Sequence, residues 1–304
     1  MLKSEIELKE SLNHLISWQL NDRQICDLEL LLNGAFNPLK GFMNKKDYNS
    51  VRDNMRLANG SLWPIPINLD VTENFSEQIN FGDKIVLRDK EGFPLALLTI
   101  SDIWKPDLLL EAELVYGTKD IIHPGVNYLL NSTNKFYLGG ILNGISYPRH
   151  YDYIKFRYSP EDLKKIFKNL GWKKIIAFQT RNPLHCAHVE MTKRALNENN
   201  AKLLIHPVVG MTKPGDVNHH TRLRCYQSVL KRYEEGDAIL SLIPLAMRMG
   251  GPREAVWHAI IRKNYGCSHL IVGRDHAGPG KDSEGQEFYG PYDAQNLLMK
   301  YQVE

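Results

Sequence analysis

Residues 175–188 read IIAFQTRNPLHCAH, an apolar run followed by a polar turn and a proline. The run predicts a buried strand, and Pro183 is typical of the first position of a helix. His185 and His188 then lie three residues apart, on one helix face. Such a helix N-terminus attracts anions through its unpaired backbone N–H groups and its dipole. We interpret this stretch as a nucleotide phosphate site.

Helices and strands alternate from residue 160 onward. The pattern predicts helices at 160–169, 183–197, 221–233, 252–265 and 293–301, and strands at 174–178, 202–207, 238–242 and 269–272. This alternation is typical of a parallel, doubly wound sheet. In such sheets ligands bind beyond the carboxyl ends of the strands, where the loops of unusual composition fall.

The first half has a different pattern. Short strand-like runs at 63–71, 84–87 and 94–103 are separated by turn residues, and helices are expected within 22–41 and at 126–134. Residues 147–153 have the composition of a linker, and Ser159 is a typical helix N-cap. We therefore predict a mainly β domain over 1–150 and an α/β domain over 151–304.

Composition limits the function further. A chain of 304 residues with 43% hydrophobic content can bury a large core, and its net charge of +3 gives no strong field for nucleic acid or membranes. It lacks the roughly 18 consecutive apolar residues of a membrane span, and its first ten residues lack a signal-peptide core. The four cysteines form no C-x-x-C pair, so we expect a cytoplasmic protein without disulfides.

Three more strand-to-helix loops carry polar chemistry. Residues 206–216 include Lys213, residues 245–254 place two arginines around a glycine pair, and residues 273–280 contain three glycines. Glycines let backbone amides approach a ligand closely. Together with residues 179–188, these loops are expected to assemble several cations with little carboxylate to neutralise them.

These four motifs, in this order, resemble ATP sulfurylase (sulfate adenylyltransferase). Residues 31–42, LLNGAFNPLKGF, show the same resemblance, which therefore covers nearly the whole chain. Four long motifs in family order are far more specific than an H-x-x-H pair alone. The resemblance implies a PUA-like N-terminal domain followed by a Rossmann-like, parallel-sheet nucleotidyltransferase domain.

The resemblance also implies residue roles, motif by motif. A catalytic turn would comprise Thr180, Arg181 and Asn182, and His185 and His188 would stabilise phosphate charge. ATP would contact that turn together with Gln179, Gly273, Arg274, Asp275 and His276. Sulfate would contact Gln179, Arg181 and Ala277.

The implied reaction transfers AMP from MgATP to sulfate and releases adenylyl sulfate and pyrophosphate. Sulfate is already a dianion, so its attack needs no general base, and the barrier is repulsion between two oxyanions. Arg181, Arg274 and the two histidines can offset this repulsion, which favours direct in-line displacement. ATP and sulfate are the expected partners, and Mg²⁺ carried by ATP is the expected cofactor. A homo-oligomer is possible, but the sequence does not decide the oligomeric state.

Plainer interpretations remain. His185, Cys186 and His188 could bind a metal, but Cys186 faces another side of the helix and no third ligand follows at a standard spacing, so we predict no protein-bound metal. Arg181 and Arg274 could be structural ion-pair partners, and the glycines of 273–280 could simply make a tight turn. As a whole, the chain could be a non-catalytic nucleotide or oxyanion binder, or use another oxyanion acceptor.

Two departures from the family pattern matter. Cys186 stands where the family usually has arginine, which removes one positive charge beside the phosphate site. The family's usual chain also continues past Tyr301 with another strand, an adenine-contacting segment and a phosphate motif of the Ile-Ser-Gly-Thr type. We therefore expect the nucleotide pocket to be open on one side.

Overall fold

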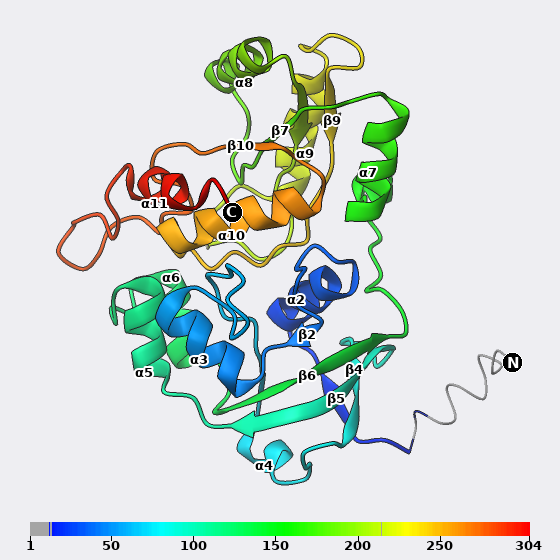
Figure 1. Ribbon diagram of the computed structural model, residues 1–304, viewed down its shortest axis with the longest axis vertical. Coiled ribbons are helices and arrows are strands. Elements are labelled where there is room, and N and C mark those ends of the chain that lie inside the picture. The colour runs from blue at the N-terminus through cyan, green and yellow to red at the C-terminus, as the bar shows by residue number, and fades with distance from the viewer. Residues whose placement is uncertain (1–11, 13, 214) are drawn as a thin grey trace, which may run out of the picture.

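The computed structural model describes residues 12, 14–213 and 215–304. Figure 1 shows the N-terminal half below and the C-terminal half above, with helix α10 (Gly251–Asn264) running along the boundary between them. The charged N-terminal segment of residues 1–10 lies outside the described residues. Each half is built on its own sheet.

The N-terminal half contains a mixed sheet in the order β1–β4–β5–β6–β2, with β3 paired to β6. Its strands are β1 (Ser17–Gln19), β2 (Gly41–Phe42), β3 (Leu69–Val71), β4 (Lys84–Arg88), β5 (Pro94–Trp104) and β6 (Phe136–Gly144). Its helices are α2 (Asp22–Leu32), α3 (Lys45–Asn54), α4 (Glu73–Ser76), α5 (Leu108–Glu111), a π-helical turn at Ala112–Tyr116, and α6 (Pro124–Asn131). Helices α2, α3 and α6 lie on the side of this sheet that faces the C-terminal half (Figure 1).

The C-terminal half contains a fully parallel sheet in the order β10–β7–β8–β9. Its strands are β7 (Ile175–Phe178), β8 (Lys202–Ile205), β9 (Ala238–Leu240) and β10 (His269–Ile271). Besides α10, its helices are α7 (Pro160–Asn169), α8 (Cys186–Asn199), α9 (His219–Leu230) and α11 (Asp293–Tyr301), with a 3₁₀ turn at Ile154–Phe156.

The strand order reverses between β7 and β10. Strands β7, β8 and β9 follow one another across the sheet, and β10 then returns to the other side of β7. Ligands of open α/β sheets bind in the crevice beside such a reversal. The fold therefore marks the loops after β7 and β10, residues 179–185 and 272–280, as the place for a site.

Helices α7 and α11 begin and end where the sequence predicted, but the helix after β7 does not. It begins at Cys186 instead of Pro183. The reason lies in the preceding turn, where the Thr180 hydroxyl accepts a hydrogen bond from the backbone N–H of Asn182 at 3.0 Å and also lies 3.0 Å from the Asn182 carbonyl oxygen. His185 is therefore the N-cap residue, in extended backbone conformation, and only His188 lies within the helix.

The N-terminal half contains the predicted strands in part. The run 63–71 is a strand only at Leu69–Val71, because Pro64 and Pro66 cannot donate ladder hydrogen bonds. Helix α3 and the long strand β6 were not predicted. In β6 a glycine pair hides the strand pattern, and a Cβ atom at Gly140 would lie 2.3 Å from the Thr99 carbonyl oxygen, so this backbone approach requires glycine.

The two halves are joined through a shared core. One apolar cluster contains buried residues of both halves, including Phe36, Trp63 and Trp257. The buried Arg248 guanidinium pairs with the Asp27 carboxylate at 2.5 Å, and the His123 ring lies 3.0 Å from the Tyr289 hydroxyl. The position of the C-terminal loops is thereby fixed against the N-terminal half.

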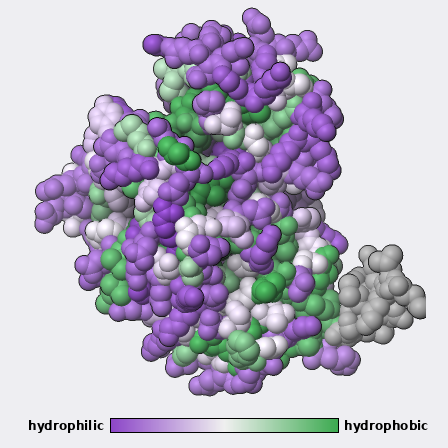
Figure 2. Space-filling view, viewed as in Figure 1, coloured by the Kyte–Doolittle hydropathy of each residue, from purple (hydrophilic) through white to green (hydrophobic). Residues whose placement is uncertain are grey.

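The described helices include none that is both long and apolar enough to cross a membrane. On the face shown in Figure 2, hydrophilic residues predominate and hydrophobic residues occupy separate small areas. The four cysteines are all free, as the sequence predicted.

Candidate active site

A cavity of about 210 Å³ lies at the strand reversal. It is lined by Arg181 from the loop after β7 and by Asp275, His276 and Gly278 from the loop after β10. Lys213, Pro252 and Tyr289 close its other sides. All four loops that the sequence singled out therefore contribute residues to one cavity, although nearly 100 positions separate the first loop from the last.

Arg181 is held by a carboxylate. Its Nη1 lies 2.5 Å from Oδ1 of Asp216, and the two side chains are 18% and 7% exposed. The other Asp216 oxygen is buried and has no hydrogen-bond partner among the described residues. The expectation of cations with little carboxylate beside them is therefore wrong at Arg181, because Asp216, at the end of the second loop, neutralises this arginine.

The loop after β10 has a constrained backbone. Asp275 and Ala277 have φ values of 52° and 55°, a left-handed conformation that non-glycine residues rarely adopt. The Ala277 carbonyl accepts a hydrogen bond from the N–H of Gly251, and its own N–H has no backbone partner within the described part of the chain. This N–H is therefore free to donate to a ligand.

A buried chain of polar groups reaches the cavity through His276. Both Glu254 oxygens accept backbone N–H groups, from Arg248 at 2.9 Å and Gly250 at 2.8 Å, and Glu254 lies 3.3 Å from His258 Nε2. His258 Nδ1 in turn lies 2.9 Å from His276 Nε2. Burial opposes the charge of Glu254, but hydrogen bonds from His258 and the two backbone N–H groups hold its pKa below the usual value.

The direction of this chain follows from the carboxylate. Because Glu254 is ionised, His258 Nε2–H donates to it and His258 Nδ1 accepts from His276 Nε2–H. Burial, and then His258, lowers the pKa of His276 to about 3. His276 therefore offers the cavity an unprotonated Nδ1, an acceptor suited to an amino or hydroxyl group rather than to a phosphate oxygen.

Gln179 lies beside the same chain. Its Nε2 is 3.3 Å from His258 Nε2, and its Oε1 is buried without a hydrogen-bond partner among the described residues. Because His258 Nε2 carries a proton, a half-turn of the amide that places Oε1 beside it replaces a donor–donor contact with a hydrogen bond. The NH₂ group then takes the position of the unpaired oxygen and can donate to an anion.

Hydrogen bonds hold the backbone of the predicted catalytic turn. Besides the contacts of Thr180, the Asn182 carbonyl oxygen accepts a hydrogen bond from the Tyr226 hydroxyl at 2.8 Å. The Asn182 residue itself is exposed. Arg274 and Gly273 are also exposed, on the same loop as Asp275, and neither of them lines the cavity.

The two histidines of the H-x-x-H pair lie together but outside this cavity. Their ring centroids are 3.9 Å apart at the N-terminus of α8. His185 lines a separate hollow between α8 and α9, with Cys186 and Arg224. The structure thus joins Arg181 to the loop after β10 and leaves the histidines as a neighbouring group at the helix N-terminus.

Comparison with known families supports the resemblance. The ATP-sulfurylase family model matches residues 154–304, and a PUA-like domain model matches residues 2–147. The chain belongs to the ATP-sulfurylase family. Its architecture is that of a PUA-like domain followed by an α/β nucleotidyltransferase domain, as the sequence predicted.

Among curated proteins, the sulfate adenylyltransferase of Kluyveromyces lactis is 57% identical over 299 residues, which cover 98% of this chain and 59% of the relative. That of Saccharomyces cerevisiae is 55% identical, covering 99% and 59%. A solved structure, the hexameric APS kinase from Thiobacillus denitrificans, is 32% identical with a TM-score of 0.74, covering 88% of this chain and 49% of that one. The chain thus spans about half to three fifths of the length of these proteins.

The sequence did not assign roles to Asp216, Glu254 and His258. Glu254 and His258 stand four residues apart on α10, a spacing that puts both on one helix face and could have indicated their pairing. The contact between Asp216 and Arg181 spans 35 residues and carries no local signal.

Proposed function

We propose that this chain catalyses the transfer of an adenylyl group from MgATP to sulfate. The observation that carries the proposal is the cavity shared by Arg181 and the loop after β10, placed at the strand reversal of the sheet. At about 210 Å³ it is smaller than the 300–1,000 Å³ of a typical small-molecule site, so it accommodates part of a nucleotide. The phosphates would extend toward the N-terminus of α8.

The chemistry of each predicted site residue suits a different part of the substrates. The acceptor Nδ1 of His276 suits a hydroxyl or amino group of the nucleoside, with Gly273, Arg274 and Asp275 along the same loop. Arg181 would stabilise the charge that builds up as sulfate meets the α-phosphate, within the turn of Thr180 and Asn182. Gln179 and the free N–H of Ala277 would donate to sulfate, and His185 and His188 to the departing pyrophosphate.

Mg²⁺ would come with the nucleotide. The carboxylates of Asp275 and Glu287 line the cavity, so oxygen ligands of the kind that Mg²⁺ prefers are present. The ion would neutralise charge on the departing pyrophosphate. Asp216 is already paired with Arg181 and is not among the residues that line the cavity, so it is not counted among these ligands.

The reverse reaction tests the proposal most directly. The purified chain should form ATP from adenylyl sulfate and pyrophosphate, and luminescence would measure the ATP. The forward reaction should release pyrophosphate only when ATP and sulfate are both present. Pyrophosphate release with another oxyanion, such as phosphate or a phosphonate, would identify a different acceptor. Nucleotide binding without turnover in either direction would contradict the proposed activity.

We also propose a domain boundary between residues 150 and 151, supported by family matches that end at 147 and begin at 154. Homo-oligomerisation stays a proposal, supported by the hexameric relative of known structure. The cytoplasmic location predicted from the sequence stays a prediction.

MgATP binding should draw a proton onto His188. Burial, and then the neighbouring His185, holds the pKa of His188 below its ordinary 6.5, so the free ring is neutral at pH 7. A bound phosphate favours the charged form, so affinity should rise as pH falls from 8 toward 6. Titration calorimetry in two buffers of different ionisation enthalpy should show proton uptake that His188→Asn abolishes. His269→Asn, an exposed histidine on β10, is the control, and equal uptake in both variants would contradict the assignment.

Cys186→Arg should tighten ATP binding. Cys186 is exposed at the first position of α8, so a longer side chain fits there and adds a positive charge beside the phosphates. A solvent-exposed charge about 4 Å from an anion contributes about 1 kcal/mol, equivalent to about 5-fold in affinity. Cys186→Gln is the uncharged control, and equal or weaker ATP affinity in Cys186→Arg would refute this role of position 186.

A further inference from the structure

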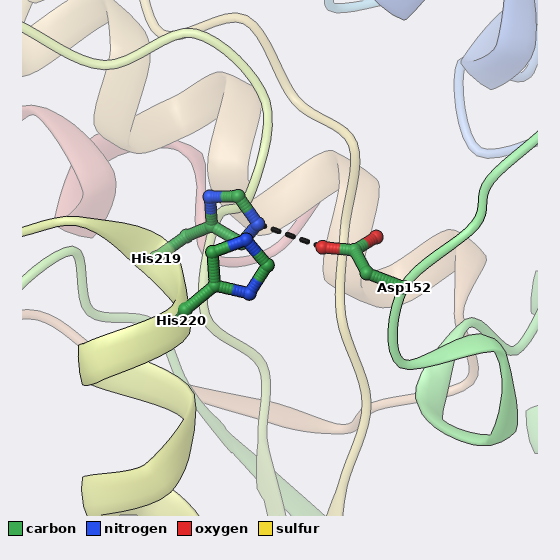
Figure 3. A group of neighbouring side chains, drawn as sticks. All are labelled: Asp152, His219 and His220. Carbon is green, nitrogen blue, oxygen red and sulfur yellow. Dashed lines mark hydrogen bonds and ion pairs between the residues drawn. The ribbon is translucent and has the colours of Figure 1, made fainter.

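A second group of polar side chains lies away from the cavity, where the connector between the halves meets the start of α9. Asp152 belongs to the connector, and His219 and His220 are the first two residues of α9. The nearest ligand-type atoms of these residues all lie within 4.8 Å of one another. Figure 3 shows the Asp152 carboxylate pointing toward the two rings.

The arrangement brings together three donors of suitable chemistry. Asp152 Oδ2 lies 2.7 Å from His219 Nε2, and the ring centroids of His219 and His220 are 4.0 Å apart. His219 and Asp152 are about 30% exposed and His220 is more exposed, so water and ions can reach the group. Sixty-seven residues separate the carboxylate from the first histidine, so the fold rather than local sequence brings them together.

We propose that Asp152, His219 and His220 form a binding site for a divalent metal ion of the Zn²⁺, Co²⁺ or Ni²⁺ class. Two imidazoles and one carboxylate favour these ions over Mg²⁺ and Ca²⁺, which prefer sites made of oxygen alone. Zn²⁺ binds imidazole nitrogen and carboxylate oxygen at about 2.0–2.2 Å, so a small movement of the exposed His220 completes three protein ligands. Water would fill the remaining positions on the solvent side.

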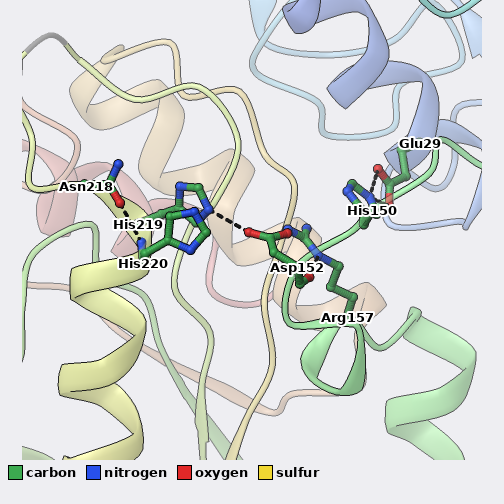
Figure 4. Close-up of polar contacts among 7 residues, drawn as sticks. All are labelled: Glu29, His150, Asp152, Arg157, Asn218, His219 and His220. Atoms are coloured by element: carbon green, nitrogen blue, oxygen red, sulfur yellow. Dashed lines mark hydrogen bonds and ion pairs between the residues drawn. The ribbon is translucent and has the colours of Figure 1, made fainter. Parts of the chain in front are cut away.

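The neighbours of the carboxylate support this role. Arg157 Nη2 binds Asp152 Oδ1 at 2.7 Å and its Nε binds the Asp152 carbonyl at 3.1 Å, which orients the carboxylate and leaves Oδ2 toward the histidines. Figure 4 shows this order of residues, with Asn218 on the other side of the histidines. Partners that orient a ligand in this way raise metal affinity.

A metal ion at this site would stabilise the position of the 206–216 loop, whose Asp216 pairs with Arg181. His219 is three residues beyond Asp216, whose carboxylate holds that arginine. An ion bridging the connector and α9 would therefore fix one end of the 206–216 loop. This ion is distinct from the Mg²⁺ that a nucleotide brings, because its ligands lie outside the cavity lining.

His220 separates this proposal from a plain ion pair. Asp152 and His219 could bond simply to fasten the connector, but the His220 side chain takes no part in that bond or in the contact with Arg157. His220→Ala therefore removes a metal ligand and leaves both contacts in place. A matched control exists two residues before Asp152, where His150 pairs with Glu29 at 2.9 Å and no third ligand is found among the described residues (Figure 4).

The experiment titrates the nucleotide-free chain with Zn²⁺ by calorimetry, and with Co²⁺ by visible absorption, in excess Mg²⁺. We expect saturable binding and a Co²⁺ d–d spectrum in the wild type and in His150→Ala, and an affinity more than about 10-fold weaker in His220→Ala. Zn²⁺ should also raise the unfolding temperature of the wild type more than that of His220→Ala. All variants carry the same cysteines, so binding at cysteine cancels in the comparison. Equal Zn²⁺ affinity in the wild type and His220→Ala, or no binding in the wild type, would overturn the proposal.

Discussion

Arg181→Ala should lower the turnover of adenylyl transfer by roughly 100-fold or more, the usual consequence of removing a preorganised donor from a developing charge. Arg181 is the cation that lines the cavity from the β7 side, and its side chain is only 18% exposed, so little water screens it. Steady-state rates of pyrophosphate release measure the effect. Because the interaction strengthens in the transition state, kcat should fall more than KM rises.

Asp216, the buried partner of Arg181, makes it necessary to separate an effect on stability from an effect on turnover. Removing Arg181 leaves the Asp216 carboxylate, 7% exposed, without its cation, which costs stability as well as activity. The double variant Arg181→Ala/Asp216→Asn should recover the stability and leave turnover low. Arg194→Ala on α8, where the exposed arginine pairs with Glu198, should leave turnover unchanged. Wild-type turnover in the folded double variant would remove Arg181 from the site.

Arg181→Lys extends the argument to geometry. Lysine keeps the charge but lacks the planar fork that can contact Asp216 and a ligand oxygen together. We expect its turnover to fall between those of the wild type and Arg181→Ala.

The sequence predicted the elements whose signals are local. Ser159 was predicted as an N-cap, and α7 has its predicted bounds and begins with a capping box of Ser159 and Asp162. The apolar run before Gln179 is strand β7. The order of the strands in the sheet could not be predicted from local sequence. The return of β10 beside β7 needs contacts between residues some 90 positions apart, and it determines where the cavity lies.

The candidate site shows the same division. Arg181 and Asp275 were predicted from their motifs, and the structure places both at one cavity. The start of α8 was wrong by three residues because the Thr180 hydroxyl competes for backbone groups of the turn, and a helix-start pattern does not include that competition. Asp216 was missed because an ion pair across 35 residues leaves no periodicity in the sequence.

Asp27→Ala should lower the free energy of unfolding by about 3–5 kcal/mol, because it leaves the Arg248 guanidinium uncompensated inside the protein. Arg248 and Asp27 side chains are 5% and 2% exposed, and their bond at 2.5 Å joins α2 of the N-terminal half to the loop before α10. Denaturant unfolding followed by tryptophan fluorescence measures the loss, and Lys165→Ala, at an exposed ion pair on α7, should show no measurable change.

The Asp27 variant should also disturb the site from a distance. Glu254 accepts a hydrogen bond from the backbone N–H of Arg248. A movement of Arg248 would therefore shift Glu254 and, through it, His258 and His276. Asp27→Leu with Arg248→Met removes both charges together and should recover most of the stability, since an apolar pair can replace a buried ion pair at little cost. If nucleotide affinity stays low in this stable double variant, the Arg248 backbone positions the site through Glu254. If affinity recovers fully with stability, the ion pair serves only to join the two halves.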